Sequence, residues 1–451
     1  MNTARQTRRQ FLKHSTALLC AGVMTPSACT ATRQRWVKRQ SKNDRLRLGA
    51  IGMRYQGTVI AKKALPWADV VAICDVDRNI AEWARAEFGG KADLYEDYRK
   101  MLERSDIDAV TIGTPDHWHT AIAVAACQAG KDVYCEKPLT LTIDEGKLLC
   151  KVVKETGRVF QVGTWQRSDA RFRLACEMVR AGRLGKLKKV TVTIDQNPTG
   201  GPFDTEPAPP PHLNWDLWLG QAPRVLYCKE RCHYTFRWWY EYAGGKITDW
   251  GAHHLDIAHW GMGADWSGPV EIDGKARFPD IGDGRGVPAW FNGYNVPPWF
   301  EATMIYPDGL ELDVKCQGTI GVLFEGEKGS IFVTRSSIES KPAELLEDDA
   351  LAREQYRLYA HDNLARTTKV GKLDATHNHM GNFFDCIETR NTPISDVVSQ
   401  HRSASACHLA NISMRLGRKL IWDPKRELFV GNDKANGWLS REQRNPYEIK
   451  A

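Results

Sequence analysis

The chain has 451 residues, which is long enough for two domains with a buried core in each. With 42% hydrophobic and 26% charged residues, it has the composition of a soluble globular protein. Residues 1–44 hold nine Lys and Arg and one acidic residue, so the formal charge of +7 arises there, and residues 45–451 hold 53 basic and 54 acidic residues. A near-neutral body excludes the basic surface that nucleic-acid binding requires, and we expect no nucleic-acid partner.

The N-terminal segment carries a pair of arginines followed by an apolar run. Residues 7–13 read Thr-Arg-Arg-Gln-Phe-Leu-Lys, and residues 17–24 are apolar. This pattern resembles a twin-arginine export signal, whose cargo crosses the membrane already folded. The run is too short to span a bilayer. We therefore expect a signal over residues 1–31 and a basic linker over residues 32–44.

The signal implies the export machinery as a partner and a periplasmic or other extracytoplasmic location. The alternative is a basic disordered tail. Cys29 follows Ser27-Ala28 as in a lipoprotein site, but Pro26 stands where a leucine is expected, so a lipid anchor stays open.

Twelve cysteines in an exported chain could form disulfides. However, Cys74, Cys127 and Cys386 lie in apolar runs, where we expect them to be small buried hydrophobes. Cys228 and Cys232 precede a histidine, but three residues separate them where haem attachment needs two, so we interpret this pair as structural.

Strand and helix patterns alternate from residue 45 to about residue 167. Strands are predicted at 46–51, 70–74, 109–113, 133–135 and 159–162, and helices from 57 and at 80–88, 98–103, 120–129 and 143–156. This alternation predicts a doubly wound parallel sheet, a Rossmann domain over residues 45–167.

The pattern changes in residues 168–451, where we expect a substrate-binding and oligomerisation domain. Longer strands separated by turns are predicted at 186–194, 300–305, 310–316, 321–325 and 330–334. They indicate an open mixed or antiparallel sheet. Residues 198–211 and 279–298 are rich in Pro and Gly and predict surface loops.

A glycine turn follows the first strand and opens the first helix. Gly52 and Gly57 bracket Arg54 and Gln56, in a pattern like the dinucleotide fingerprint, where glycines let a pyrophosphate approach a helix N-terminus. Arg54 replaces the middle glycine, so the backbone cannot approach as closely there, but its guanidinium could pair with a phosphate.

An acidic residue ends the second strand in the matching position. Asp75, 18 residues past Gly57, can accept hydrogen bonds from both adenosine ribose hydroxyls and repels a 2′-phosphate. This favours NAD over NADP, although Arg78 nearby would suit NADP. Without the glycine turn, the alternative would be an acid in a solvated loop.

Two further loops follow strands of the predicted parallel sheet. Thr114, Trp118 and His119 come after the strand at 109–113 and would face the ribose and nicotinamide, or Trp118 and His119 would merely pack the helix start. Glu136 and Lys137 follow the strand at 133–135, where Pro138 breaks the ladder. A lysine at this sheet edge can hold its ammonium over a ligand oxygen.

A histidine and an aspartate lie more than a hundred residues further on. In a helix, Asp249 and His253 share one face at i, i+4, and Asp256 would fix the tautomer of His253. A histidine in reach of a hydroxyl can accept its proton, and Lys137 can stabilise the alkoxide. The alternative is a capped helix with core histidines.

A metal site built on His253, His254, Asp256 and His259 is disfavoured. Consecutive histidines point about 100° apart on a helix and cannot readily ligate one ion. We therefore expect no metal.

These motifs in this order resemble the glucose–fructose oxidoreductase/inositol dehydrogenase (Gfo/Idh/MocA) family over about residues 45–425. Glu136-Lys137-Pro138 together with Asp249 and His253 carries the resemblance. It implies that Lys137 contacts the nicotinamide and the substrate hydroxyl, that His253 is the general acid/base and that Asp249 orients the substrate. It also implies a homo-oligomer.

Aromatic side chains suit the C–H faces of sugar rings, and the chain has 16 tryptophans. Trp165 and Arg167, just past the last strand of the first domain, are the first candidates for the substrate side of the cleft. The further candidates share only their place in the second domain, and they are Arg237, Tyr240, His254 and, more speculatively, His377 and His379.

We therefore expect an exported oxidoreductase that transfers hydride to and from a hydroxyl of a sugar or glycoside. Since no NAD pool is expected outside the cytoplasm, the enzyme would carry its NAD tightly bound. One alternative is a redox-neutral glycosidase or epimerase that oxidises, eliminates and reduces. Another is a non-catalytic sugar-binding protein, against which the intact lysine, aspartate and histidine argue.

Overall fold

The computed structural model describes residues 45–279, 292–347 and 372–450. The export signal and linker predicted for residues 1–44 lie outside this part, as does most of the loop predicted at 279–298. No helix within these ranges has the length and apolar character needed to cross a bilayer.

A six-stranded parallel sheet forms the first part of the fold, with strand order β3-β2-β1-β4-β5-β6. The strands are β1 (Leu46–Ile51), β2 (Ala68–Cys74), β3 (Asp93–Tyr95), β4 (Ala109–Ile112), β5 (Asp132–Cys135) and β6 (Phe160–Val162). The helices between them are α2 (Gln56–Ala64), α3 (Arg78–Glu87), α4 (Tyr98–Leu102), α5 (Asp116–Gln128) and α6 (Ile143–Thr156). The order reverses between β1 and β4, which creates the crevice where doubly wound sheets bind ligands.

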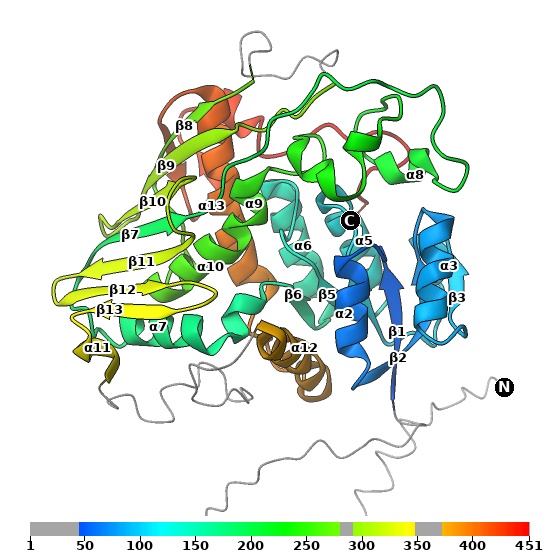
Figure 1. Ribbon diagram of the computed structural model, residues 1–451, viewed down its shortest axis with the longest axis horizontal. Coiled ribbons are helices and arrows are strands. Elements are labelled where there is room, and N and C mark those ends of the chain that lie inside the picture. The colour runs from blue at the N-terminus through cyan, green and yellow to red at the C-terminus, as the bar shows by residue number, and fades with distance from the viewer. Residues whose placement is uncertain (1–44, 280–291, 348–371, 451) are drawn as a thin grey trace, which may run out of the picture. The chain divides into compact units, whose positions relative to one another are not determined.

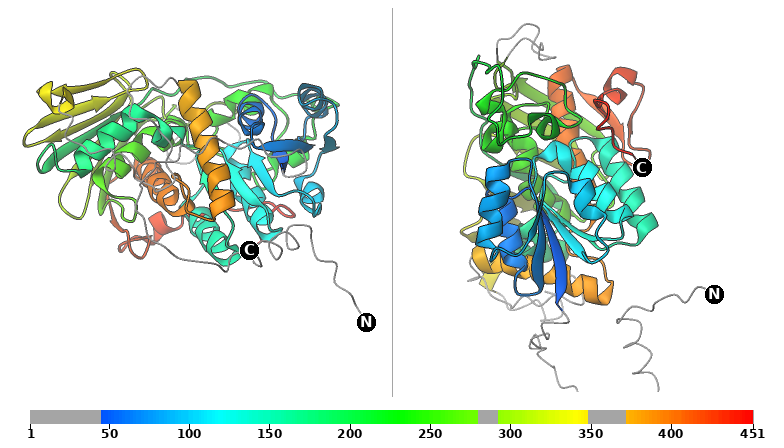
Figure 2. Two further views of the ribbon diagram at one scale, coloured as in Figure 1. Left: turned by 90° about the horizontal axis from the view of Figure 1, so that it is seen from below. Right: turned by 90° about the vertical axis from the view of Figure 1, so that its right-hand side faces the viewer.

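Apolar side chains fill both faces of this sheet, which explains why its strands are continuous hydrophobic runs. Helices α2 and α3 cover one face and α4, α5 and α6 the other (Figure 2). Helix α12 (Lys372–Thr389) returns from late in the chain and packs against α2, where Met380 and Phe383 join the core. Asp77 caps α3 and Thr142 caps α6 by accepting backbone N–H bonds.

A nine-stranded mixed sheet forms the second part, with order β13-β12-β11-β7-β10-β9-β8-β14-β15. Its strands are β7 (Leu187–Thr193), β8 (Glu271–Arg277), β9 (Trp299–Ile305), β10 (Glu311–Lys315), β11 (Gly321–Gly326), β12 (Gly329–Val333), β13 (Ile338–Lys341), β14 (Leu420–Asp423) and β15 (Leu428–Phe429). Only β7 and β10 pair in parallel.

Three helices pack on one face of this sheet, namely α7 (Ala170–Arg180), α10 (Gly251–Met262) and α13 (Val397–Leu416) (Figure 1). Phe300, Ala302 and Met304 alternate inward along β9 and meet Trp260 of α10 in the core. The alternation leaves the intervening side chains on the opposite face of the sheet.

Shorter helices connect these elements. They are η1 (Trp165–Ser168), α8 (Trp215–Leu219), η2 (Lys229–Arg231), η3 (His233–Trp238), α9 (Lys246–Asp249), α11 (Glu344–Glu347) and α14 (Asp433–Asn436), where η denotes a 3₁₀ helix.

The predicted fold class is confirmed, as a parallel doubly wound sheet followed by a mixed sheet. Strands β3, β8, β13, β14 and β15 were not predicted, because they are short or strongly polar. The single helix expected across Asp249 and His253 is divided between α9 and α10, with Trp250 between them. None of the ten cysteines in the described part forms a disulfide, and Cys74, Cys127 and Cys386 are buried as expected.

Candidate active site

A cavity of about 1100 Å³ opens at the carboxyl edge of the parallel sheet, and both parts of the fold line it. Residues that follow β1, β2, β4 and β5 form one wall. The opposite wall comes from η3, α9, α10 and the turn after β12. This edge is where doubly wound folds bind their ligands.

Lys137 and Asp249 meet in this cavity. Lys137 lies two residues past the end of β5, after Glu136, and Asp249 is the last residue of α9. Lys137 Nζ lies 2.5 Å from Asp249 Oδ1, and the two side chains are 14% and 11% exposed. Burial alone would raise the pKa of Asp249, but Lys137 and Arg237 outweigh it and hold the pKa at about 2. The aspartate is therefore ionised throughout the neutral range.

Arg237 and His253 complete the catalytic end of the cavity. Arg237 Nε lies 3.6 Å from the same Asp249 oxygen. His253, in the first turn of α10, lies edge-on to the Trp165 ring with centroids 6.1 Å apart. All of these side chains line the cavity, so the predicted lysine, aspartate and histidine are brought together.

The glycine turn is tightly closed. Gly52 has φ +75°, and a Cβ at Gly57 would lie 1.6 Å from the Gly52 carbonyl oxygen, so no other residue fits at Gly57 without moving the backbone. Gly52 lines the cavity, whereas Gly57 sets the approach of α2 to the sheet.

Asp75 closes the same turn from the next strand. Its carboxylate accepts N–H bonds from Met53 at 2.7 Å and Asp77 at 2.9 Å, while its side chain still lines the cavity. Burial raises the pKa of Asp75 to about 6, against the lowering effect of these two bonds.

Arg54 and Gln56 have partners within the protein. Arg54 Nη2 lies 2.8 Å from Asp77 Oδ2, and the arginine side chain is 42% exposed at the cavity. Gln56 Nε2 donates to Glu136 Oε1 at 2.9 Å. Glu136 is buried, which raises its pKa against the opposing effect of Lys137. Gln56 and Glu136 therefore connect the glycine turn to the lysine loop.

Trp118 and His119 differ in position. Trp118 lines the cavity and donates its indole N–H to the Trp218 carbonyl at 3.0 Å. His119 is buried behind the cavity wall, with its ring nitrogens 2.7 Å and 3.0 Å from the carbonyl oxygens of Pro138 and Thr114. It therefore joins the two loops instead of facing the cofactor as predicted.

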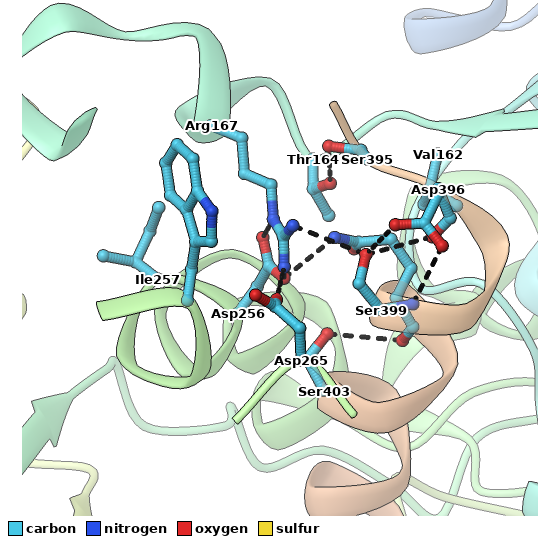
Figure 3. A network of polar contacts seen from close by, with 12 residues as sticks. Val162, Thr164, Arg167, Asp256, Ile257, Asp265, Ser395, Asp396, Ser399 and Ser403 are labelled. Atoms are coloured by element: carbon cyan, nitrogen blue, oxygen red, sulfur yellow. Dashed lines mark hydrogen bonds and ion pairs between the residues drawn. The ribbon is translucent and has the colours of Figure 1, made fainter. Parts of the chain in front are cut away.

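Arg167 does not line the cavity, and its prediction as a substrate residue is wrong. It is fully buried in a polar network, with Nη2 at 2.6 Å from Asp256 Oδ1 and 2.9 Å from Asp265 Oδ1 (Figure 3). Asp256 also accepts a bond from Gln400 at 2.8 Å. Asp256 therefore holds Arg167 and cannot be assigned to the tautomer of His253, which corrects a second expectation.

Tyr240, His254 and His379 also lie away from the cavity. Tyr240 borders a separate cavity of about 330 Å³. His254 is fully buried and stacks on Trp250, and burial lowers its pKa to about 3. His379 is buried with Nε2 at 2.8 Å from the Val162 carbonyl oxygen. The side chain of His377 lies outside the described residues.

Two charged residues at the catalytic end of the cavity were missed. Asp116, the first residue of α5, is 4% exposed, and burial raises its pKa to about 7 despite nearby Arg237. Its place in the loop after β4 could have singled it out. Arg335, after β12, lines the catalytic end from the far sheet, and nothing in its sequence context signals this.

The cavity suits NAD on the evidence of its own residues. The closed glycine turn at Gly52 leaves backbone facing the cavity, and Asp75 stands at the end of β2 for the ribose hydroxyls. Thr114, Trp118 and Lys137, which follow β4 and β5, line the same cavity. Within residues 45–279, 292–347 and 372–450, no cluster of three or more His, Cys, Asp or Glu could hold a metal ion.

By its fold and site this is an NAD-binding oxidoreductase with two domains. The profile of the oxidoreductase family with an NAD-binding Rossmann fold (Gfo/Idh/MocA) matches residues 46–164, and the profile of its C-terminal alpha/beta domain matches residues 199–346 and 349–449. The chain belongs to the Gfo/Idh/MocA family, which confirms the resemblance seen in the sequence.

Similar proteins act on sugars and inositols. The scyllo-inositol 2-dehydrogenase (NAD(+)) of Bacillus subtilis is 25% identical over 386 residues, covering 84% of this chain and 96% of that enzyme. A glycosyl hydrolase family 109 protein of Shewanella pealeana is 28% identical over 208 residues, 40% of this chain and 44% of that protein. The aldose-aldose oxidoreductase of Caulobacter crescentus, solved with glycerol, has the same fold with a TM-score of 0.61 at 18% identity, covering 84% and 99% of the two chains.

Proposed function

We propose that this protein oxidises a hydroxyl-bearing carbon of a sugar or glycoside, using NAD bound in the cavity. The observation that carries the proposal is the Lys137–Asp249 pair beside His253, at the end of the cavity away from Asp75. When bound, NAD supplies the hydride acceptor. The B. subtilis relative, an inositol dehydrogenase, supports a polyhydroxylated ring as substrate.

Each residue of the catalytic end has a distinct role. Oxidation of a carbinol removes a hydride from carbon and a proton from oxygen, and His253 accepts the proton. The ammonium of Lys137 stabilises the negative charge that develops on the oxygen. Asp249, ionised at neutral pH, holds that ammonium in place and accepts a bond from a neighbouring substrate hydroxyl. The reverse sequence returns proton and hydride to a carbonyl.

The tryptophans of this end suit a sugar ring. Trp165 and Trp250 line the cavity together with His253 and come from different elements, Trp165 from η1 and Trp250 from the break between α9 and α10. Indole faces pack against the C–H faces of pyranose rings, so we assign these two as the substrate platform. We also assign Arg237 to the substrate, a role that its proximity to Asp249 supports.

We also propose export by the twin-arginine route, on the strength of residues 7–13 and 17–24, with or without a lipid anchor at Cys29. An exported enzyme must bring its cofactor with it. The two-sided lining of the cavity supports a retained NAD, because Leu213, His233 and Tyr234 from the second domain line the same cavity as Arg54 and Asp77.

Retained NAD requires a second half-reaction that oxidises it again. The C. crescentus neighbour, an aldose-aldose oxidoreductase, supports a cycle in which one sugar is oxidised and another is reduced. The S. pealeana relative, a glycosyl hydrolase family 109 protein, supports the redox-neutral alternative, in which oxidation, elimination and reduction occur on one substrate. A homo-oligomer through the sheet face opposite α7, α10 and α13 remains our expectation.

Two measurements on the purified chain test the proposal. The first denatures protein prepared without nucleotide and identifies what is released by mass spectrometry, where near-stoichiometric NAD or NADH is expected. The second offers a panel of sugars and glycosides and follows nicotinamide fluorescence and products. An accumulating carbonyl product supports the oxidoreductase, and glycoside hydrolysis without net reduction supports the redox-neutral alternative. If no sugar gives either result, both proposals are refuted.

A further inference from the structure

Arg335 is fixed in the catalytic end of the cavity by a chain of hydrogen bonds. It follows β12 in the turn that leads to β13, and its Nε donates to Gln166 Oε1 at 2.8 Å. Gln166 is fully buried, and its Nε2 donates to the His253 carbonyl at 3.2 Å. The guanidinium is therefore held at a set position relative to the helix that carries His253.

Two indole rings flank this guanidinium. Arg335 Cζ lies 4.4 Å from the ring centroid of Trp250 and 5.0 Å from that of Trp165. Both tryptophans line the cavity together with Arg335 and His253. The apolar faces exclude water and stabilise the cation, but they offer it no negative charge.

Arg335 has no carboxylate partner among the described residues, although every other cation of this end has one. Lys137 and Arg237 both lie within ion-pair distance of Asp249, whereas Arg335 interacts with Asp249 and Asp169 only at longer range. Burial lowers the pKa of Arg335 to about 10, so it stays charged at neutral pH. Its two Nη groups make no hydrogen bond within that part of the chain, and both are free to donate.

A half-buried guanidinium without a counter-charge is costly unless a ligand provides one. The paired Nη groups match the two oxygens of a carboxylate, with which guanidinium forms parallel bonds. A doubly charged phosphate fits less well, because the nearby Asp249 carboxylate is ionised and repels it more strongly.

We propose that Arg335 binds a carboxylate of the substrate, so the substrate is an acidic sugar, a uronic or aldonic acid or a glycoside of one. This inference rests on the proposed function, since the oxidised hydroxyl lies at His253 while the carboxylate lies at Arg335. The two groups belong to one molecule that spans the platform of Trp165 and Trp250. Arg335 thus determines specificity and takes no part in proton transfer.

The test compares matched pairs of neutral and acidic sugars on the NAD-loaded full chain. Methyl glycosides of glucose, galactose and mannose are paired with the corresponding uronates, and the 6-phosphates form a third arm. We expect wild type to favour the uronate in at least one pair, and Arg335→Met to lower the acid-to-neutral ratio of kcat/KM by at least about 30-fold, as for loss of one partner of a desolvated charge pair. Arg335→Lys should restore part of the ratio.

Arg277→Met is the matched control. Arg277 also lies over an indole, 5.2 Å from the Trp299 centroid, but it is exposed on β8 and does not line the cavity, so its loss should leave the ratio unchanged. Three results would each overturn the inference. They are an equal loss of kcat/KM with both members of a pair in Arg335→Met, a preference of wild type for neutral sugars, and a preference of wild type for the phosphates.

Binding separates this inference from the proposed function. Tryptophan fluorescence, to which Trp165 and Trp250 beside Arg335 contribute, reports uronate binding without turnover. Arg335-dependent uronate binding without nicotinamide reduction by any sugar would refute the oxidation but support the ligand class. Turnover of neutral sugars with no uronate binding would support the oxidation but refute the ligand class. Retained nucleotide in each variant shows that it has folded.

Discussion

Lys137 Nζ and Asp249 Oδ1 lie 2.5 Å apart although 112 positions separate them in the chain. One residue follows a strand of the parallel sheet, and the other ends a helix before the layer that covers the mixed sheet. The catalytic end therefore exists only when both parts of the fold are in place. The pair also explains why Asp249 stays ionised in a buried setting, because Lys137 and Arg237 hold its pKa at about 2 against the effect of burial.

Replacing Lys137 by Met should abolish turnover while leaving the cofactor bound. Loss of one donor to a developing oxyanion costs about 100- to 1000-fold in kcat. The rate of nicotinamide reduction and the nucleotide released on denaturation measure the two effects separately. Lys151→Met, at a side chain that is 65% exposed, is the control and should behave as wild type. Unchanged turnover in Lys137→Met would contradict the role of Lys137 in stabilising the developing oxyanion.

His253→Ala should lower kcat by about 100- to 10,000-fold, because the hydroxyl proton loses its acceptor. Sugar binding, followed by tryptophan fluorescence, should change far less, since Trp165 and Trp250 remain. If wild type and His253→Ala both bind sugar equally well and both are inactive, the protein is a binding protein and not an enzyme.

Asp116→Asn should change the pH dependence of stability. Burial raises the pKa of Asp116 from 3.8 to about 7, so the folded protein retains a proton that the unfolded chain loses, and stability declines as pH rises between these values. An asparagine cannot ionise, so the unfolding free energy of the variant should rise relative to that of wild type between about pH 4 and about pH 8, by up to roughly 4 kcal/mol. Urea unfolding at both pH values measures this gain.

The exposed Asp204 provides the control for that experiment, since Asp204→Asn should show no pH-dependent difference from wild type. A constant difference between Asp116→Asn and wild type at both pH values would contradict the assignment of a buried proton to Asp116.

Arg167→Met should destabilise the fold and leave substrate recognition intact. It removes the buried cation that compensates Asp256, and breaking such a pair costs about 3–5 kcal/mol in unfolding free energy. The exposed pair of Lys62 and Glu87 provides a comparison, where Lys62→Met should cost less than about 1 kcal/mol. A raised KM for the sugar with unchanged stability would restore Arg167 to the substrate site.

Local sequence signals predicted the parallel sheet and most of the catalytic end. The glycine turn, Asp75 and Lys137 each follow a strand, and the carboxyl ends of parallel strands meet at one edge, so their convergence can be derived without coordinates. Grouping Asp249 with His253 required only the assumption that a helix places residues i and i+4 on one face. That relation held approximately, although the helix is interrupted at Trp250.

Residues whose role depends on a distant partner were not predictable in this way. Arg167 follows the last strand of the parallel sheet as expected, but it pairs in the core with Asp256 and Asp265, about 90 to 100 residues away in the chain. Arg335 enters the cavity because β12 lies beside β11 and β13 at one end of the mixed sheet, a pairing order that no local pattern encodes. Short strands such as β3 leave too few residues for a periodic signal.

The most direct test of the central claim follows the transferred atom. A sugar that the enzyme oxidises is prepared with deuterium on the reacting carbon and mixed with one equivalent of NAD-loaded protein. The nucleotide is released by denaturing the protein in cold organic solvent at neutral pH, and its mass is measured by mass spectrometry. We predict NADH that carries the deuterium in wild type and none above background in Lys137→Met. A deuterium-free nucleotide in wild type, with an equivalent amount of the oxidised carbonyl product formed, would contradict hydride transfer at this site.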